Sequence, residues 1–212
     1  MLWKQVYNMQ KKILKFNFIY FIIFFFIASC SSVPKYPNNA CKIFGEKYFY
    51  LKYTRAASKK WGVPISSILA VINKESGFRR FAKPKRTKLF KIIPYKRPSS
   101  SLGFSQSIRG SWNLYKKENN KPAALRISYK SSSDFIGWYF WKTNKINKIA
   151  FTDTRNMYLN YYLGWKAYKN KAYRIDKKAI IFAKSVEKQA KIYKNQLREC
   201  QKILDRNKYI IF

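Results

Sequence analysis

A short apolar run, from Ile68 to Ile72, most constrains how this chain can fold. Its residues have the spacing of a helix face, with Pro64 suited to a first helical turn and Gly77 to a helix end. The same face continues to Glu75, in a chain with only nine carboxylates and no histidine. A carboxylate in an apolar stripe is unusual for packing but is what general acid chemistry requires.

Helical spacing recurs along most of the chain. The predicted helices cover residues 42–60 and 64–76, part of 102–118 after a glycine turn, and segments beginning near 134, 153 and 176, the last reaching 200. Residues Ser131–Ser133, Asp153 and Asp176 are the expected N-terminal caps or starts. Residues 79–101 are predicted to form a long basic loop with three prolines, functional or mobile. Strand-like alternation is scarce, so we expect an all-α domain.

The N-terminus is typical of an export signal. Lysines precede an apolar segment from Phe16 to Ile27 that is too short to span a bilayer. It ends in Ile-Ala-Ser-Cys, which resembles the lipobox of bacterial lipoproteins. That resemblance implies cleavage after residue 29 and a lipid on Cys30, followed by a flexible tether over 30–40. The alternative is an ordinary signal peptide with an incidental cysteine.

The charge of the chain is strongly positive. Removal of residues 1–29 takes away four lysines and no acids, which lowers the net charge from +36 to +32. Such a surface favours an anionic partner, such as nucleic acid, acidic lipid or peptidoglycan. The alternative is a coding bias towards Lys, Ile, Asn, Phe and Tyr. Export argues against nucleic acid.

Two cysteines remain after Cys30. In an exported chain the pair Cys41 and Cys200 predicts a disulfide, and two free buried thiols are the alternative. Without histidine, a Ser-His-Asp or Cys-His nucleophilic site is excluded, and zinc sites with the usual ligands are not expected. We therefore expect no metal and no cofactor.

Three segments in order resemble one enzyme family. They are Glu75-Ser76-Gly77-Phe78, Gly103-Phe104-Ser105-Gln106 and Tyr158-Leu159-Asn160-Tyr161-Tyr162-Leu163-Gly164. They resemble the Glu-Ser-x-Phe, Gly-Leu-Met-Gln and Ala-Tyr-Asn-x-Gly motifs of lytic transglycosylases with the soluble-lytic-transglycosylase (SLT), lysozyme-like fold. The segments 99–106 and 134–139 and the late cysteine are also similar to a lipoprotein subgroup of that family. The implied domain covers 41–204, with 205–212 as a C-terminal tail.

The resemblance implies a peptidoglycan lytic transglycosylase. In that family one glutamate, here Glu75, protonates the glycosidic oxygen between N-acetylmuramic acid and N-acetylglucosamine. The same residue then deprotonates the muramic C6 hydroxyl, which closes a 1,6-anhydro ring. Partial burial and a helix C-terminus favour a raised pKa for Glu75, whereas nearby Lys74, Arg79 and Arg80 oppose it.

Supporting roles follow from the same resemblance. Ser76 and Gln106 would bind substrate, although Gln106 can equally fix a loop. Tyr161 would hydrogen-bond Glu75 or a sugar, unless it is a core aromatic residue. Tyr162 would also contact the glycan, and it stands where the family has asparagine or histidine. For Asp134 a helix N-cap is favoured over a second acid, and Arg126 is a substrate contact or a structural ion-pair partner.

The expected protein is thus a monomeric enzyme, anchored by its lipid at the periplasmic face of the outer membrane. Its partners would be peptidoglycan strands and the membrane, with no nucleic acid. A catalytically weakened glycan-binding lipoprotein on the same fold is one alternative. A basic lipoprotein that binds an acidic partner is another.

Overall fold

The computed structural model describes residues 33–206 except 91, and the regular structure among them is mostly helical. Its elements are α2 (Ala40–Glu46), α3 (Tyr48–Trp61), α4 (Ile65–Ser76), β1 (Lys88–Leu89), β2 (Ile93–Pro94), α5 (Arg109–Glu118), α6 (Tyr129–Asn147), α7 (Thr154–Leu163), α8 (Trp165–Lys169), η1 (Ala172–Arg174) and α9 (Lys177–Arg206). The all-α prediction is confirmed. The expected signal segment, Cys30 and most of the predicted tail lie outside the described residues.

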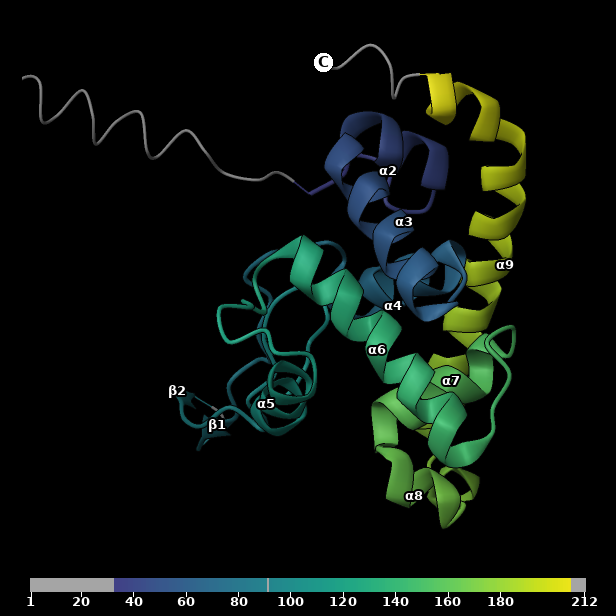
Figure 1. Ribbon diagram of the computed structural model, residues 1–212. Coiled ribbons are helices and arrows are strands. Elements are labelled where there is room, and N and C mark those ends of the chain that lie inside the picture. Colours follow the sequence, from purple (N-terminus) through teal and green to yellow (C-terminus); the bar gives the residue numbers. More distant parts are fainter. Residues whose placement is uncertain (1–32, 91, 207–212) are drawn as a thin grey trace, which may run out of the picture. The chain divides into compact units, whose positions relative to one another are not determined.

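The predicted apolar helix, α4, lies at the centre of the domain (Figure 1). Residues Ile68 to Ile72 are completely buried. The helix packs against α9, which runs along one side of the domain, and against α3 and α6. Burial on all sides explains why the apolar run is continuous rather than confined to one stripe. Gly77 ends α4 in the left-handed conformation, with φ of 56°.

Several helix ends are as predicted and others differ. The side chains of Asp153 and Asp176 accept hydrogen bonds from backbone amides at the starts of α7 and α9. The predicted helix over 42–60 is instead two helices, because the backbone leaves the helical region at Lys47. The cap of α6 is Ser128, whose hydroxyl accepts from the amide of Ser131.

The two ends of the domain are joined. Cys41 and Cys200 form a disulfide between α2 and α9, with 6.0 Å between their Cα atoms. The described part of the predicted tether also packs on the domain. The carbonyl of Pro37 accepts hydrogen bonds from the hydroxyl of Tyr193 and from the side-chain amide of Asn73. Among the described residues, contacts with the domain therefore start before position 41.

The predicted basic loop contains a small antiparallel hairpin, in which Leu89 pairs with Ile93. Figure 1 shows the two strands extending from the helices beside α5. No helix among the described residues is long and apolar enough to cross a membrane.

Candidate active site

Glu75 lies in a cavity of about 340 Å³ at the C-terminal end of α4. The other lining residues come from the segment before and into α5, from α6, and from the end of α7: Ser99, Ser101, Gln106, Ser107, Ile108, Ser111, Phe135, Tyr139, Tyr161, Tyr162, Leu163 and Gly164. All three segments that resemble the transglycosylase motifs therefore contribute to one cavity. Among its lining residues Glu75 is the one carboxylate.

The surroundings of Glu75 favour its protonated form. Loss of hydration in this partly buried position raises the pKa of Glu75 from 4.5 to about 7. A hydrogen bond from the hydroxyl of Tyr158, 2.7 Å from Oε1, and the charge of Lys74 act in the opposite direction. At neutral pH the Glu75 carboxyl group is thus close to half protonated, as a group that both donates and accepts a proton requires.

Ser76 does not reach this cavity. It is buried, and its hydroxyl donates to the carbonyl of Ile72 one turn earlier in α4. Its position therefore supports the last turn of the helix that carries Glu75.

The cavity wall around Gln106 is a tightly closed loop. Gln106 has a φ of 47°, and its Nε2 donates to the carbonyls of Ala82 and Gly103, both at 2.8 Å. Gly103 lies so close to the carbonyl oxygen of Arg126 that a Cβ atom would be 2.0 Å from it. This position therefore requires glycine, both for space and for its φ of 77°. Gln106 thus fixes the loop while its side chain lines the cavity.

Arg126 holds the same wall from the other side. Its Nη1 donates to the carbonyl of Ser107 at 3.0 Å and to that of Ser100 at 2.6 Å. The structure shows neither of the two roles that the sequence suggests for Arg126. It binds backbone carbonyls rather than a carboxylate, so it is not an ion-pair partner, and it does not line the cavity as a substrate contact would.

Aromatic residues of α7 form the opposite wall. Tyr161 donates its hydroxyl to the carbonyl of Ser105, so it connects α7 to the Gln106 loop rather than to Glu75. Tyr162 is 38% exposed and lies edge-on against Phe182 of α9. The partner of Glu75 is Tyr158, one turn before Tyr161 and Tyr162. Sequence reasoning did not single it out, although it opens the third matched segment.

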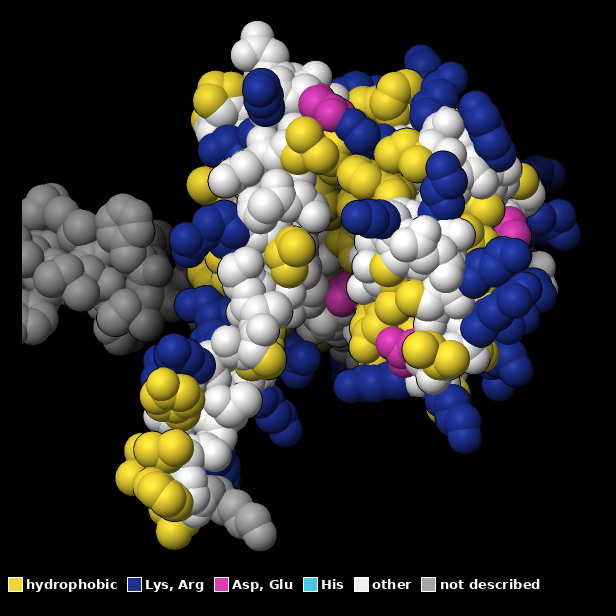
Figure 2. All heavy atoms as spheres, turned by 90° about the horizontal axis from the view of Figure 1, so that it is seen from below, with side chains coloured by type: hydrophobic (Ala, Val, Ile, Leu, Met, Phe, Trp, Pro, Cys, Tyr) yellow, Lys and Arg dark blue, Asp and Glu magenta, His cyan; other side chains and the backbone are white. Residues whose placement is uncertain are grey.

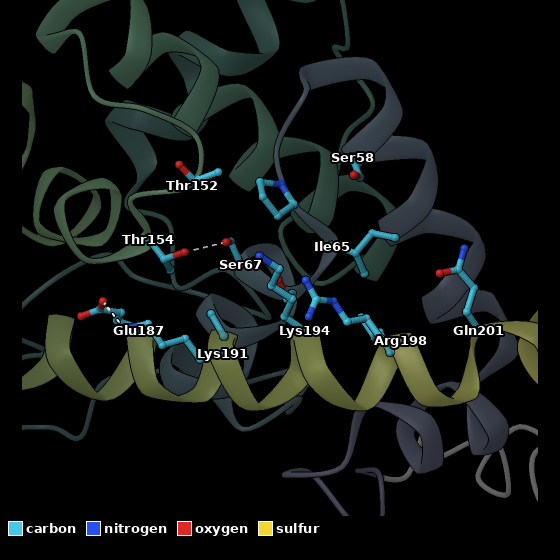
Figure 3. Close-up of a pocket in the computed structure, with 14 residues that line it drawn as sticks. Ser58, Ile65, Ser67, Thr152, Thr154, Glu187, Lys191, Lys194, Arg198 and Gln201 are labelled. Atoms are coloured by element: carbon cyan, nitrogen blue, oxygen red, sulfur yellow. Dashed lines mark hydrogen bonds and ion pairs between the residues drawn. The ribbon is translucent and has the colours of Figure 1, made fainter.

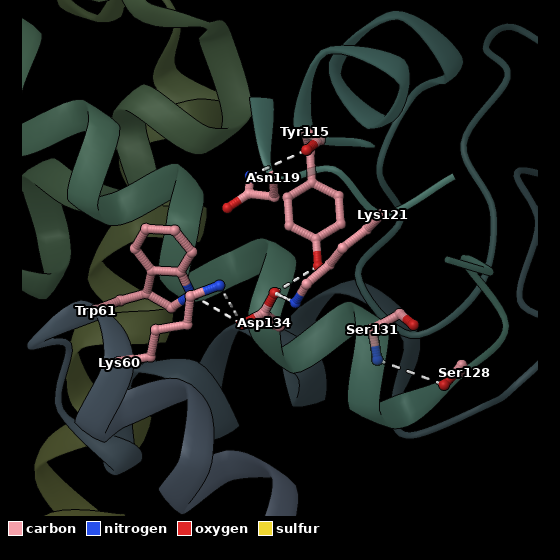
Figure 4. Close-up of polar contacts among 8 residues, drawn as sticks. All are labelled: Lys60, Trp61, Tyr115, Asn119, Lys121, Ser128, Ser131 and Asp134. Carbon is pink, nitrogen blue, oxygen red and sulfur yellow. Dashed lines mark hydrogen bonds and ion pairs between the residues drawn. The ribbon is translucent and has the colours of Figure 1, made fainter. Parts of the chain in front are cut away.

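Asp134 belongs to a different cluster, which connects three parts of the chain (Figure 4). Its carboxylate accepts from Trp61 Nε1 at 2.9 Å, from the hydroxyl of Tyr115 and from Lys121, and Lys60 lies at 3.7 Å. Burial raises the pKa of Asp134, but these hydrogen bonds outweigh it and the pKa lies below the ordinary value. Asp134 is therefore an ionised structural residue within α6. The expectation that it caps the helix is wrong, because Ser128 does so.

A second cavity, of about 460 Å³, lies between α4, α7 and α9 (Figure 3). Its one lining carboxylate, Glu187, is ion-paired with Lys191 at 2.7 Å, and the hydroxyls of Ser67 and Thr154 bond each other. This cavity has no partly buried acid comparable with Glu75, so the Glu75 cavity is the candidate active site.

An all-α domain with a partly buried glutamate at the end of its central helix is the arrangement that the resemblance to lysozyme-like transglycosylases implies. The model of the transglycosylase SLT domain family matches residues 18–200, and the chain belongs to that family. Membership makes it a protein of the lytic transglycosylase type, which acts on peptidoglycan. No curated protein matches the chain.

Proposed function

We propose that this protein is a peptidoglycan lytic transglycosylase that cleaves the β-1,4 bond between N-acetylmuramic acid and N-acetylglucosamine. The observation that carries the proposal is the pairing of a raised pKa at Glu75 with a cavity lined by one carboxylate. Ordinary retaining or inverting glycoside hydrolysis uses two carboxylates about 5–9.5 Å apart. A reaction that needs a single acid fits the lining residues better.

In the proposed reaction Glu75 acts twice. Protonated Glu75 first gives its proton to the glycosidic oxygen, and the bond from that oxygen to the muramic C1 breaks. The carboxylate then removes the proton from the muramic C6 hydroxyl, and the C6 oxygen bonds to C1. The products are a 1,6-anhydro-muramyl end and a free N-acetylglucosamine hydroxyl, with Glu75 protonated again. A pKa near 7 suits both steps.

Tyr158 and the predicted site residues other than Glu75 have positioning or binding roles in this proposal. Tyr158 orients the Glu75 carboxyl group, and Ser76 stabilises the helix turn that carries it. Gln106 and Tyr161 fix the loop at the cavity wall, with part of each side chain facing the glycan. Tyr162, the most exposed of these aromatic residues, offers a ring and a hydroxyl to a sugar.

The location of the enzyme is part of the proposal. The lipobox-like sequence at Cys30 supports a lipid-anchored protein of the lipoprotein subgroup, held at the periplasmic face of the outer membrane. There it would act as a monomer on peptidoglycan strands, without a cofactor or a nucleic-acid partner. Radiolabelled palmitate should be incorporated by the wild-type chain and not by a Cys30→Ser variant.

The reaction is tested by the products released from purified sacculi. Wild type should release 1,6-anhydro-muropeptides, detected by mass, and Glu75→Gln should lower the release by at least about a hundredfold. Glu187→Gln, which alters an exposed ion pair in α9, is the matched control and should retain wild-type release. Reducing ends instead of anhydro ends would refute the transglycosylase reaction. Binding to sacculi without release by wild type would favour the catalytically weakened glycan-binding protein.

A further inference from the structure

The segment from residue 79 to 97, called the basic hairpin below, has a tip that the domain does not cover. At this tip Phe90 is 81%, Ile92 78% and Ile93 56% exposed, and Leu89 and Tyr95 are also exposed. Figure 2 shows hydrophobic side chains gathered at the far end of a projection from the domain. A cluster of large apolar side chains this exposed is typical of a surface that binds a partner or a membrane.

The charge of the basic hairpin is entirely of one sign. It contains nine lysines and arginines and no carboxylate, and the nearest acids in the sequence are Glu75 and Glu118. None of its described residues makes an ion pair within the domain. In Figure 2 lysine and arginine side chains lie along the projection behind its apolar end. The cations are therefore available to an anionic surface.

We infer that the basic hairpin docks on the surface of a bilayer that contains anionic phospholipid, with its apolar tip among the acyl chains near the headgroups. Interfacial membrane-binding segments commonly have an apolar end flanked by lysine and arginine side chains. Burial of the apolar end in hydrocarbon and attraction of the cations to acidic lipid then act together. Long lysine and arginine side chains can reach headgroup phosphates while the tip is submerged.

The apolar tip separates this partner from other polyanions. Peptidoglycan carboxylates or nucleic-acid phosphates would satisfy the cations, but they offer no hydrocarbon to Ile92 and Ile93. The strands are also closed on themselves, since Thr87 exchanges backbone hydrogen bonds with Tyr95 and Lys96. These bonds pair the inward-facing backbone groups, whereas the outer edges of the two strands stay unpaired and need water or headgroups. The hairpin backbone should therefore lie at headgroup level, with only the apolar side chains of the tip reaching the acyl chains.

Docking would also set the position of the active site. Ser99 and Ser101, which directly follow the basic hairpin, line the Glu75 cavity. The backbone amide of Arg109 donates to the hydroxyl of Ser100, so this connection is held against the start of α5. A docked hairpin would therefore keep the cavity close to the membrane surface, independently of whether Glu75 performs the proposed reaction.

The test is photo-crosslinking of the full chain on vesicles. The benzophenone analogue of phenylalanine replaces Phe90 in one sample and Phe49 in the other. Phe49 is 58% exposed on α3, outside the basic hairpin. Adduct formed at this position measures how close the rest of the protein lies to lipid without docking of the hairpin. Vesicles contain phosphatidylethanolamine with phosphatidylglycerol, or phosphatidylcholine alone, and lipid adducts are measured by mass.

With phosphatidylglycerol, position 90 should give at least about fivefold more lipid adduct than position 49, and this excess should disappear on phosphatidylcholine. Replacing Lys85, Arg86, Lys88 and Lys96 by glutamine should lower the adduct by about fivefold or more. Replacing Ile92 and Ile93 by serine should lower it as well. Circular dichroism and thermal unfolding of these variants establish that the domain is folded.

Equal adduct yields at positions 90 and 49, or on both kinds of vesicle, would overturn the inference. So would crosslinking of position 90 to muropeptides or to an added oligonucleotide when vesicles are present in the same mixture. The measured quantity is lipid adduct and not glycan cleavage. A failed docking test would therefore not contradict the proposed reaction, and a failed cleavage assay would not contradict the docking.

Discussion

The hydroxyl of Tyr158 donates a hydrogen bond to Oε1 of Glu75 at 2.7 Å, which connects α7 to the end of α4 across 83 positions of sequence. Tyr158 is almost completely buried, whereas Glu75 borders the cavity. One oxygen of the Glu75 carboxyl group thus bonds to a buried tyrosine, and this hydrogen bond fixes the orientation of the carboxyl group at the edge of the cavity.

Tyr158→Phe should move the alkaline limb of the pH–activity profile to higher pH. The hydrogen bond from Tyr158 lowers the pKa of Glu75 and so opposes the effect of burial. Without this bond the pKa of Glu75 should rise further. Activity on the plateau should fall by about 10-fold to 100-fold because the carboxyl group is less well positioned. The measurement is anhydro-muropeptide release across the pH range.

Tyr161→Phe is the matched control for that prediction. It removes the bond to the Ser105 carbonyl and leaves the Tyr158–Glu75 bond in place. The alkaline limb of Tyr161→Phe should therefore stay at the wild-type pH. A shift as large as that of Tyr158→Phe would show that the specific hydrogen bond is not the cause.

The free energy of unfolding should depend on pH through Glu75. Its native pKa of about 7 is above the unfolded value, so between these pKa values the native state binds more protons. Stability from this group is complete at low pH and is lost as the pH rises through about 7. Wild type should therefore lose about 2–3 kcal/mol relative to Glu75→Gln between about pH 5 and about pH 8. Denaturant unfolding of both proteins at each pH measures this, and parallel pH dependences would contradict it.

Gly103→Ala should destabilise the domain by about 2 kcal/mol or more and lower product release. The added Cβ would meet the Arg126 carbonyl at 2.0 Å in a backbone conformation that side chains rarely adopt. Gly110→Ala is the control, because no atom lies within 4 Å of a Cβ built there and alanine favours α5. Thermal unfolding should separate the two variants, and equal melting temperatures would refute the close approach.

Asp134→Asn should lower the free energy of unfolding by about 1–3 kcal/mol, because it weakens the hydrogen bonds that this mostly buried carboxylate accepts. Lys60 and Lys121 are partly exposed, so water can hydrate them when the carboxylate is lost. The native pKa of Asp134 is depressed, so its contribution is present above the unfolded value of 3.8 and is lost as the pH falls through the native pKa. The difference from wild type should therefore shrink in acid. Glu118→Gln, which removes the ion pair with Lys142, should lower the free energy of unfolding less than Asp134→Asn does, because the Glu118 carboxylate is more exposed.

The parts of the fold that local sequence determines were predictable. The apolar run of α4 and the caps Asp153 and Asp176 depend on neighbouring residues, and all three were predicted. The cap of α6 was not, because Ser128 and the serines at 131–133 are equally able to cap. In the structure α6 begins at Tyr129, so Ser128 is the cap and the serines at 131–133 lie within the first turns of the helix.

Four of the five residues that the sequence predicts for the site line one cavity, and Ser76 does not. Glu75, Gln106, Tyr161 and Tyr162 meet at one cavity, as the three matched segments imply. The bond between Tyr158 and Glu75 depends on how α7 crosses the end of α4, which no spacing in the sequence reveals. The pKa of Glu75 likewise depends on how deeply the side chain is buried. The sequence shows nearby groups that would raise this pKa and others that would lower it, but not which effect is larger.

The bond between Cys41 and Cys200 makes almost the whole domain a covalently closed ring, with the basic hairpin on its circumference. A single protease cut at one of the exposed lysines or arginines of residues 79–97 would open this ring without releasing a fragment. The nicked protein would migrate as one species on a non-reducing gel and as two after thiol treatment. Helix α4 with Glu75 and helix α7 with Tyr158 would then lie on different peptides and still belong to one molecule.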